Sequence, residues 1–291
     1  MIVDVHTYIW QTADQIGQAD LGVLPTPAKP VGRRGVGHSS RRRIPPADPE
    51  LHWQNTRPVD RAIVLAFKSR LLRAEVPNAF VSDYVKRHPE KLIGFASIDP
   101  TDERALGDLD AAHGDLGLRG AVVSPSQQAF HPADSRAMAV YREAEARRMP
   151  VVFQTGGHLA ERARLEFARP VLIDEVARAF PKLPILIAGC GQPWMDETIL
   201  LIAKHRHVYA DVGGLLARPW QAFQALVAAH EHGVIDKLLF GSGFPFADAA
   251  DCIERLYSLN LMVQGTGLPT VPRSALRGIV ERDALRLLGL E

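Results

Sequence analysis

The chain has 291 residues, of which 46% are hydrophobic and 23% are charged, and its formal net charge is +1. This composition is typical of a globular protein with a large core. The near-zero charge argues against nucleic-acid binding, which leaves a basic footprint. No apolar run approaches the roughly 20 residues of a membrane span, and the N-terminus lacks a secretory signal pattern. We expect a cytoplasmic protein without nucleic-acid or membrane partners.

Eight short apolar runs rich in β-branched residues recur along the chain. Continuous apolar runs of this length are typical of strands buried on both faces, as in a parallel sheet. The runs are 2–5, 62–66, 92–96, 120–123, 151–153, 185–188, 208–210 and 237–240. They predict eight parallel strands.

Amphipathic segments separate these runs and predict helices that cross back over the sheet. They include residues 135–148, 171–180 and 195–205, and residues 272–288 predict two short helices at the end of the chain. Repeated βα units fit an α/β fold of the (β/α)₈ TIM-barrel type, closed or somewhat distorted. A doubly wound sheet fits less well because no glycine-rich dinucleotide fingerprint follows an early strand. We predict one barrel domain over residues 1–291.

An insertion at about residues 11–58 follows the first predicted strand and is rich in Arg, Pro and Gly. Between Pro25 and Glu50, six basic residues outweigh two acidic ones. One interpretation is a solvated loop. The other is a lid at the catalytic end of the barrel, whose arginines clamp an anionic substrate.

Nine segments, taken in order and spacing, resemble a known family. They are DVHTY at 4–8, GFASIDP at 94–100, GLRG at 117–120, QAFHP at 128–132, PVVFQTG at 150–156, FPKLP at 180–184, PW at 193–194, VYAD at 208–211 and LFGSGFPF at 239–246. This set is similar to the amidohydrolase-2 branch of the amidohydrolase superfamily. The resemblance implies a TIM barrel and a hydrolase or a non-oxidative decarboxylase of cyclic or aromatic acids. It also makes a homodimer an expectation.

The resemblance further implies a metal site, and here most of its positions are substituted. The family has His-x-His on the first strand, where this chain has His6 and Tyr8. Its ligand position on the fifth strand is Gln154, its histidine position on the sixth is Gly189, and its aspartate position on the eighth is Gly243. A zinc site needs about three protein ligands, so we expect no zinc, no other divalent metal and no other cofactor. We also expect the two glycines to enlarge the pocket.

His6 and Tyr8 are the candidate catalytic residues. Side chains two apart on a strand point to the same side, so this pair could transfer a proton if its pKa values are shifted. Alternatively, His6 hydrogen-bonds into the core and Tyr8 fills the former metal volume. Asp211, at the end of the seventh predicted strand, could pair with His6, Arg169 or a loop backbone.

Other candidates for substrate binding lie near the same end of the barrel. Gln154 and Gln192 could bind a carboxylate or an amide, or could satisfy backbone groups. Trp194 could contact the substrate or pack as the start of a helix. His131 and His158 follow the fourth and fifth strands and could reach the pocket or remain at the surface.

Two functions of different classes remain open. The first is a hydrolase or lyase acting on a small, anionic cyclic or aromatic molecule without the family's metal, in which His6 and Tyr8 move protons. The second is a catalytically inactive homologue that binds a ligand or another subunit, because fold alone does not determine activity. A nucleophilic role for Cys190, near a predicted helix start, is a weaker alternative. Neither Cys190 nor Cys252 indicates a disulfide framework or a thiolate zinc site.

Overall fold

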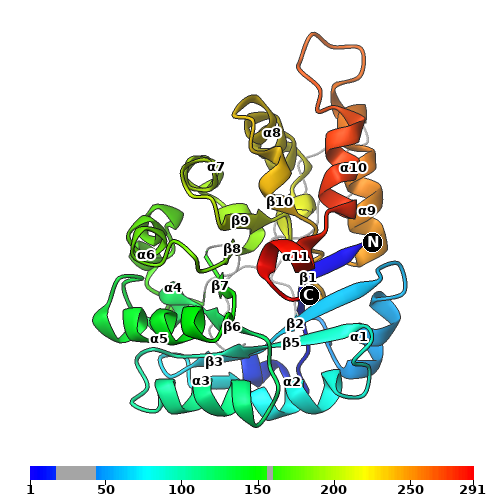
Figure 1. The fold of residues 1–291 in the computed structure, drawn as a ribbon. Coiled ribbons are helices and arrows are strands. Elements are labelled where there is room, and N and C mark those ends of the chain that lie inside the picture. Colours follow the sequence, from blue (N-terminus) through cyan, green and yellow to red (C-terminus); the bar gives the residue numbers. More distant parts are fainter. Residues whose placement is uncertain (18–43, 156–159) are drawn as a thin grey trace.

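The computed structural model describes residues 1–17, 44–155 and 160–291. In this part of the chain, eight parallel strands curl into a barrel with helices on its outside (Figure 1). In order of pairing, the strands are β1 Val3–Tyr8, β2 Arg61–Leu65, β5 Leu92–Ser97, β6 Gly120–Val123, β7 Val151–Phe153, β8 Ile185–Ile187, β9 Val208–Asp211 and β10 Leu238–Leu239. Backbone hydrogen bonds from Val5 to Phe240 and from Tyr8 to Phe244 join β1 to the segment that directly follows β10. The predicted α/β barrel is confirmed.

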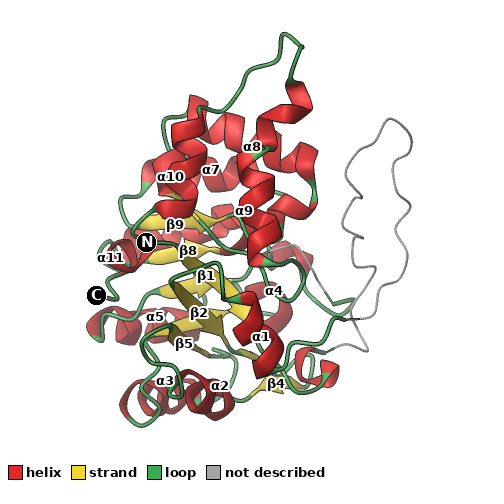
Figure 2. Ribbon diagram, turned by 90° about the vertical axis from the view of Figure 1, so that its right-hand side faces the viewer, coloured by secondary structure: helices red, strands yellow, loops and turns green. Residues whose placement is uncertain are grey.

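Helices connect successive strands and cover the barrel, as Figure 2 shows from the side. The α-helices are α1 Pro49–Asn55, α2 Asn78–Val85, α3 Ala105–Gly114, α4 Pro125–Gln128, α5 Ser135–Ala146, α6 Asp174–Ala179, α7 Met195–Lys204, α8 Pro219–Glu231, α9 Ala249–Tyr257, α10 Arg273–Glu281 and α11 Ala284–Leu288. The two terminal helices expected in 272–288 are confirmed as α10 and α11. The helix expected at 171–180 is divided into a 3₁₀ segment, Pro170–Ile173, and α6. None of the helices in the described ranges has the length and apolar character needed to cross a membrane.

Helix α1 and one β-hairpin were not predicted from the sequence. Helix α1 lies inside the insertion and begins at a cap, where the Asp48 carboxylate accepts hydrogen bonds from the backbone of Glu50 and Leu51. A hairpin of β3 Phe67–Ser69 and β4 Ala74–Val76 follows β2. Its strands are three residues long, too short to display the alternation that identifies a strand.

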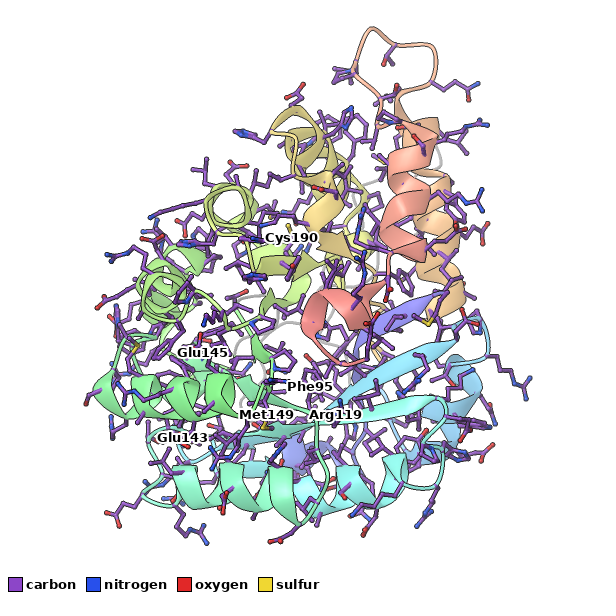
Figure 3. The ribbon with its side chains drawn as sticks, viewed as in Figure 1. Phe95, Arg119, Glu143, Glu145, Met149 and Cys190 are labelled. Atoms are coloured by element: carbon purple, nitrogen blue, oxygen red, sulfur yellow. The ribbon has the colours of Figure 1, made fainter. Side chains whose placement is uncertain are left out.

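The inside of the barrel is filled by alternate residues of each strand. Val5, Ile63 and Phe95 belong to this inner layer, and Phe95 is labelled in Figure 3. The Phe95 ring lies across Gly120 on the next strand, where a Cβ would come within 2.4 Å of it. Helix α11 closes the N-terminal end of the barrel with apolar side chains that join the inner layer. The opposite end, where the strands finish, therefore remains available for a site.

A β-bulge in β1 sets which of its side chains face inward. Asp4 pairs with Ala62 and Thr7 pairs with Val64, so two residues of β1 lie opposite one of β2. The two residues are Val5 and His6. Val3 and Val5 point into the barrel. From His6 onward the other set of alternate residues faces inward, and His6 and Tyr8 line the pocket. The bulge thus turns both polar rings toward the C-terminal end, as bulges beside functional sites commonly do.

Candidate active site

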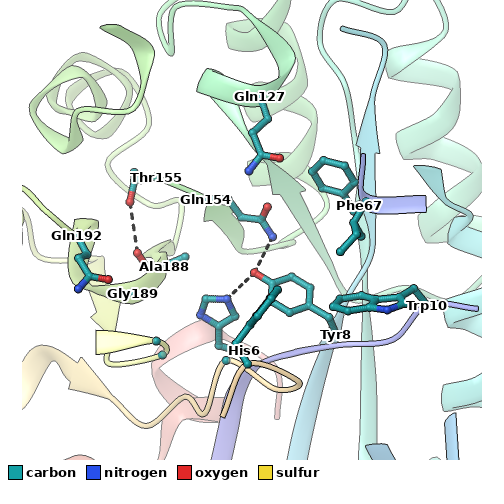
Figure 4. Close-up of a pocket in the computed structure, with 15 residues that line it drawn as sticks. His6, Tyr8, Trp10, Phe67, Gln127, Gln154, Thr155, Ala188, Gly189 and Gln192 are labelled. Atoms are coloured by element: carbon teal, nitrogen blue, oxygen red, sulfur yellow. Dashed lines mark hydrogen bonds between the residues drawn. The ribbon is translucent and has the colours of Figure 1, made fainter. Parts of the chain in front are cut away.

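A pocket opens at the C-terminal ends of the strands and encloses about 880 Å³ of space continuous with solvent. Aromatic rings form one side of it, and carboxamide side chains and glycine backbone form much of the rest (Figure 4). Its lining residues are His6, Tyr8, Trp10, Ile16, Phe67, Gln127, Gln154, Thr155, Ala188, Gly189, Gln192, Gly213, Gly214, Gly243 and Phe246. Of these described residues, His6 is the one whose side chain can become a cation near neutral pH.

A chain of hydrogen bonds leads from a buried carboxylate to this pocket. The Nδ1 atom of His6 lies 2.8 Å from Oδ1 of Asp211, and its Nε2 atom lies 2.5 Å from the Tyr8 hydroxyl. Because a carboxylate can only accept, Nδ1 carries a proton and donates it to Asp211. Nε2 is then free to exchange a proton with Tyr8. The sequence predicted His6 and Tyr8 as neighbours, and of the three partners considered for Asp211 the structure selects His6 and loop backbone.

Burial and the Asp211 charge shift the pKa values of two groups in this series of hydrogen bonds, His6 and Tyr8. Burial disfavours the His6 imidazolium, but the Asp211 charge and hydrogen bond outweigh it and raise the pKa of His6. Burial also raises the pKa of the Tyr8 hydroxyl, and the Asp211 charge adds to this effect. Tyr8 therefore remains a neutral phenol near neutral pH. Protonation of His6 adds a donor at Nε2, so the hydroxyl oxygen then accepts from His6 and its own proton can be directed to the pocket.

Gln154 positions the Tyr8 hydroxyl. Its Nε2 atom donates to the Tyr8 oxygen at 3.0 Å, and its Oε1 atom accepts from the Ser124 hydroxyl at 2.7 Å. Both ends of this buried carboxamide are therefore occupied by protein groups. Gln154 orients Tyr8 through these bonds, whereas the sequence suggested direct substrate binding or backbone contacts.

Gly189 and Gly243, which we expected to enlarge the pocket, both line it, and backbone of a neighbouring loop lies close to each of them. Both have positive φ, +57° and +72° respectively, a conformation that favours glycine. A Cβ on Gly189 would lie 2.9 Å from the Gly213 carbonyl oxygen, and one on Gly243 would lie 3.0 Å from the Gly214 nitrogen. The missing side chains let three loops approach one another, so neighbouring backbone occupies that space.

Gly213 is essential to the geometry of the pair and was not identified from the sequence. A Cβ at this position would come within 2.6 Å of His6 Nδ1 and 2.8 Å of Asp211 Oδ1. The Gly213 amide also donates to Asp211 at 2.7 Å, and the Gly189 amide does so at 3.1 Å. Its place two residues after the carboxylate that ends a predicted strand was the available signal.

The remaining predicted site residues are divided between the pocket and its surroundings. Gln192 lines the pocket, whereas Trp194 and His131 are not among the described residues that do so. Trp194 precedes α7. His131 is exposed, and its Nδ1 atom accepts from the Ala133 backbone. His158 and the six basic residues between 25 and 50 lie outside the described ranges.

Two further predictions are settled by burial and by ion pairing. Cys190 (Figure 3) is fully buried, and burial raises the pKa of its thiol to about 12, so the nucleophile alternative is wrong. Arg169 forms an ion pair with Glu197, which removes it as a partner for Asp211.

Several lining residues were not predicted because they come from loops and from the short hairpin. Trp10 follows β1, Phe67 begins β3 and Phe246 follows β10. The rings of Trp10 and Phe246 have centroids 6.0 Å apart, and Tyr8 lies 6.5 Å from Trp10. Together they form an aromatic wall that suits a flat apolar ligand surface. Ser124 could have been found from its place directly after a predicted strand.

The residues at the positions of the family's metal site do not fit a divalent cation. His6 Nε2 is in contact with the Tyr8 hydroxyl, and the raised pKa of Tyr8 opposes a phenolate ligand. Gln154 presents its carbonyl oxygen to Ser124. In the described ranges, no three His, Cys, Asp or Glu side chains form a group able to hold a metal. The substitutions thus replace metal ligands with the neutral side chains of Tyr8 and Gln154, which are hydrogen-bonded to each other.

Solved structures with the same architecture cover almost the whole chain. An uncharacterised TIM-barrel protein from Bordetella bronchiseptica is 20% identical, with 99% of this chain and 98% of that chain covered and a TM-score of 0.69. A probable 2-pyrone-4,6-dicarboxylic acid hydrolase from Acinetobacter baumannii, with citric acid bound, is 14% identical over 99% of both chains, with a TM-score of 0.65. The 5-carboxyvanillate decarboxylase LigW from Sphingomonas paucimobilis is 12% identical over 100% of this chain and 99% of that chain, with a TM-score of 0.64. At these identities the similarity establishes the fold.

The comparison with curated proteins gave no match. A family model described as amidohydrolase, of the amidohydrolase-2 type, matches residues 3–290. This match spans all the described strands and agrees with the sequence segments that carry the resemblance. The chain therefore belongs to the amidohydrolase-2 family, with most of that family's metal-ligand positions substituted.

Proposed function

We propose that this protein is a metal-independent lyase that decarboxylates a small cyclic or aromatic organic acid, with Tyr8 as the proton donor and His6 as the group that resupplies it. The observation that carries the proposal is the continuous hydrogen-bond chain from Asp211 through His6 to the Tyr8 hydroxyl at the pocket wall. Structural neighbours include a decarboxylase and a probable hydrolase, which supports this substrate class. The aromatic wall formed by Tyr8, Trp10 and Phe246 suits a flat ring.

In the proposed reaction, the ring carbon that carries the carboxylate takes a proton from the Tyr8 hydroxyl. The bond to the carboxylate then breaks, carbon dioxide leaves, and the bonding electrons return to the ring. His6, as imidazolium, donates its Nε2 proton to the Tyr8 oxygen and later takes a proton from solvent. Asp211 stabilises the imidazolium, and Gln154 holds the hydroxyl in place by donating to its oxygen.

Proton donation fits this site better than water activation does. Hydrolysis needs a base that reaches a water molecule, but the accepting atom of neutral His6 faces Tyr8. Tyr8 has a raised pKa and therefore remains in its acidic form. These features favour a lyase over a hydrolase.

The test is an assay of purified protein against a panel of aromatic and cyclic carboxylic acids, with detection of released carbon dioxide. We expect turnover that persists after dialysis against a strong chelator. His6→Phe and Tyr8→Phe should each lower kcat about 10²- to 10⁴-fold. His113→Phe and Tyr257→Phe, at exposed positions outside the pocket, are the matched controls. Turnover that requires an added divalent metal, or that survives Tyr8→Phe, would refute the mechanism.

The second candidate is a ligand-binding homologue without turnover. The substitution of the family positions by Gln154, Gly189 and Gly243 favours it. In that case, acids from the same panel would bind with measurable affinity while no member of the panel would be consumed.

A further inference from the structure

Gln192 is a buried carboxamide whose two ends have different surroundings. Its side chain is aimed into the pocket from the segment after β8, and the residue is 5% exposed. Its Nε2 atom donates to Oε1 of Gln221 on α8 at 2.8 Å. No hydrogen bond to its own Oε1 atom occurs among the described residues. Figure 4 shows the nitrogen directed away from the cavity and the oxygen directed toward it.

The orientation of this oxygen determines what can bind opposite it. A carbonyl oxygen only accepts hydrogen bonds, and so does a carboxylate. A ligand carboxylate placed against Gln192 would leave both acceptors unpaired once the ligand displaces the water between them, which costs free energy. A ligand hydroxyl or ring N–H satisfies the same oxygen.

We propose that Gln192, held in one orientation by Gln221, selects ligands whose flat ring carries a hydrogen-bond donor on the edge away from the carboxylate. The ligand carboxylate then faces Tyr8 and His6. Tyr8 supplies a hydroxyl donor, and His6 supplies a positive charge when it is protonated. This arrangement gives the pocket two chemically distinct ends. The inference rests on the proposed function for the placement of the carboxylate, whereas the donor requirement at Gln192 is a binding property that can be measured separately.

Gln221 is the positioning residue in this proposal, because its Oε1 atom accepts from Nε2 of Gln192 and so leaves the Gln192 oxygen on the pocket side. A glutamate at 221 keeps an acceptor at that place and leaves no donor, so Gln192 is obliged to retain its orientation. A methionine at 221 removes the partner and lets the carboxamide rotate.

The experiment measures binding by calorimetry, with 2-, 3- and 4-hydroxybenzoic acids and the three matched methoxybenzoic acids as probes. In the wild type, at least one hydroxyl acid should bind roughly tenfold more tightly than its methyl ether, the size of one satisfied buried hydrogen bond. Gln192→Leu should remove that preference mainly by weakening the hydroxyl acid. Gln221→Glu should retain the preference, and Gln221→Met should reduce it.

Several results would overturn the inference. They are equal binding within every pair, a preference that survives Gln192→Leu, a preference for the ether in Gln221→Glu, or no binding by any of the probes. Tyr8→Phe separates this inference from the proposed function, because it should lower kcat about 10²- to 10⁴-fold while leaving the hydroxyl preference intact. If the wild type prefers the hydroxyl acids but shows no turnover, the role of Gln192 is upheld and the lyase function is refuted. If the wild type shows turnover but no such preference, the lyase function is upheld and the role of Gln192 is refuted.

Discussion

Asp211 accepts three hydrogen bonds on its Oδ1 atom, and one of them, at 2.8 Å, comes from Nδ1 of His6, which lies 205 positions earlier in the sequence. The other two come from the backbone amides of Gly189 and Gly213. The carboxylate is fully buried, so this set of donors is what holds it next to the imidazole. The negative Asp211 carboxylate is therefore held against the side of His6 that faces away from Tyr8, and His6 is the basic ring among the described residues that line the pocket.

Replacing Asp211 by Asn should lower the pKa of His6 below its ordinary value. In the wild type the Asp211 charge outweighs burial and raises the pKa of His6. In the variant burial remains and the charge is gone. NMR titration of the His6 ring signals measures the change, and the Asp110→Asn variant, at an exposed site, is the control. A His6 pKa that does not fall in the Asp211 variant would show that Asp211 does not control this ring.

Gly213→Ala should disrupt the His6–Asp211 pair and lower the free energy of unfolding by about 1–3 kcal/mol. The added Cβ would lie 2.6 Å from His6 Nδ1, so the ring or the loop must move. Gly107→Ala in α3 is the matched control, because its Cβ meets nothing within 4 Å. That control should be stabilised by about 0.5–1 kcal/mol, as expected for Gly to Ala in a helix. Urea unfolding measures both, and equal effects of the two substitutions would contradict the packing argument.

Restoring the family's side chains should not restore a metal site. In the triple variant Tyr8→His, Gln154→His and Gly243→Asp, the aspartate introduced in place of Gly243 must extend from a backbone with φ of +72° beside Gly214. We expect a destabilisation on the order of 1–3 kcal/mol from this strain and no stoichiometric zinc by elemental analysis. One zinc per chain in the triple variant would show that the loops can reopen. Tyr8→His alone separates the effect of the ligand change from that of the strained backbone.

His52 should make the protein less stable as the pH falls. Burial lowers the pKa of this histidine to about 3, while the ordinary value in the unfolded chain is 6.5. The unfolded state therefore binds the proton more readily, and the stability that neutral His52 contributes above pH 6.5 is lost as the pH falls toward 3. The slope from this residue approaches about 1.4 kcal/mol per pH unit below the unfolded pKa.

Urea unfolding between pH 7.5 and pH 4.5 tests the role of His52. The wild type should lose stability more steeply than a His52→Leu variant. His232→Leu, at an exposed position, should keep the wild-type slope. Parallel pH profiles for the wild type and His52→Leu would contradict the assignment. The contacts of His52 with Tyr84 and Thr7 predict that His52→Leu is also less stable at pH 7.5.

The sequence alone determined the barrel, the positions of its strands, the family and the neighbouring placement of His6 and Tyr8, because these depend on local periodicity and on spacing along one strand. The tertiary structure decided the rest. Whether Asp211 reaches His6, 205 positions away, depends on closure of the barrel and on how closely the loops at its C-terminal end approach. Contacts between distant segments also produce the hairpin that carries Phe67. The same is true of the hydrogen bond between Gln192 and Gln221 and of the backbone packed beside Gly189. Local patterns carry no information about such distances.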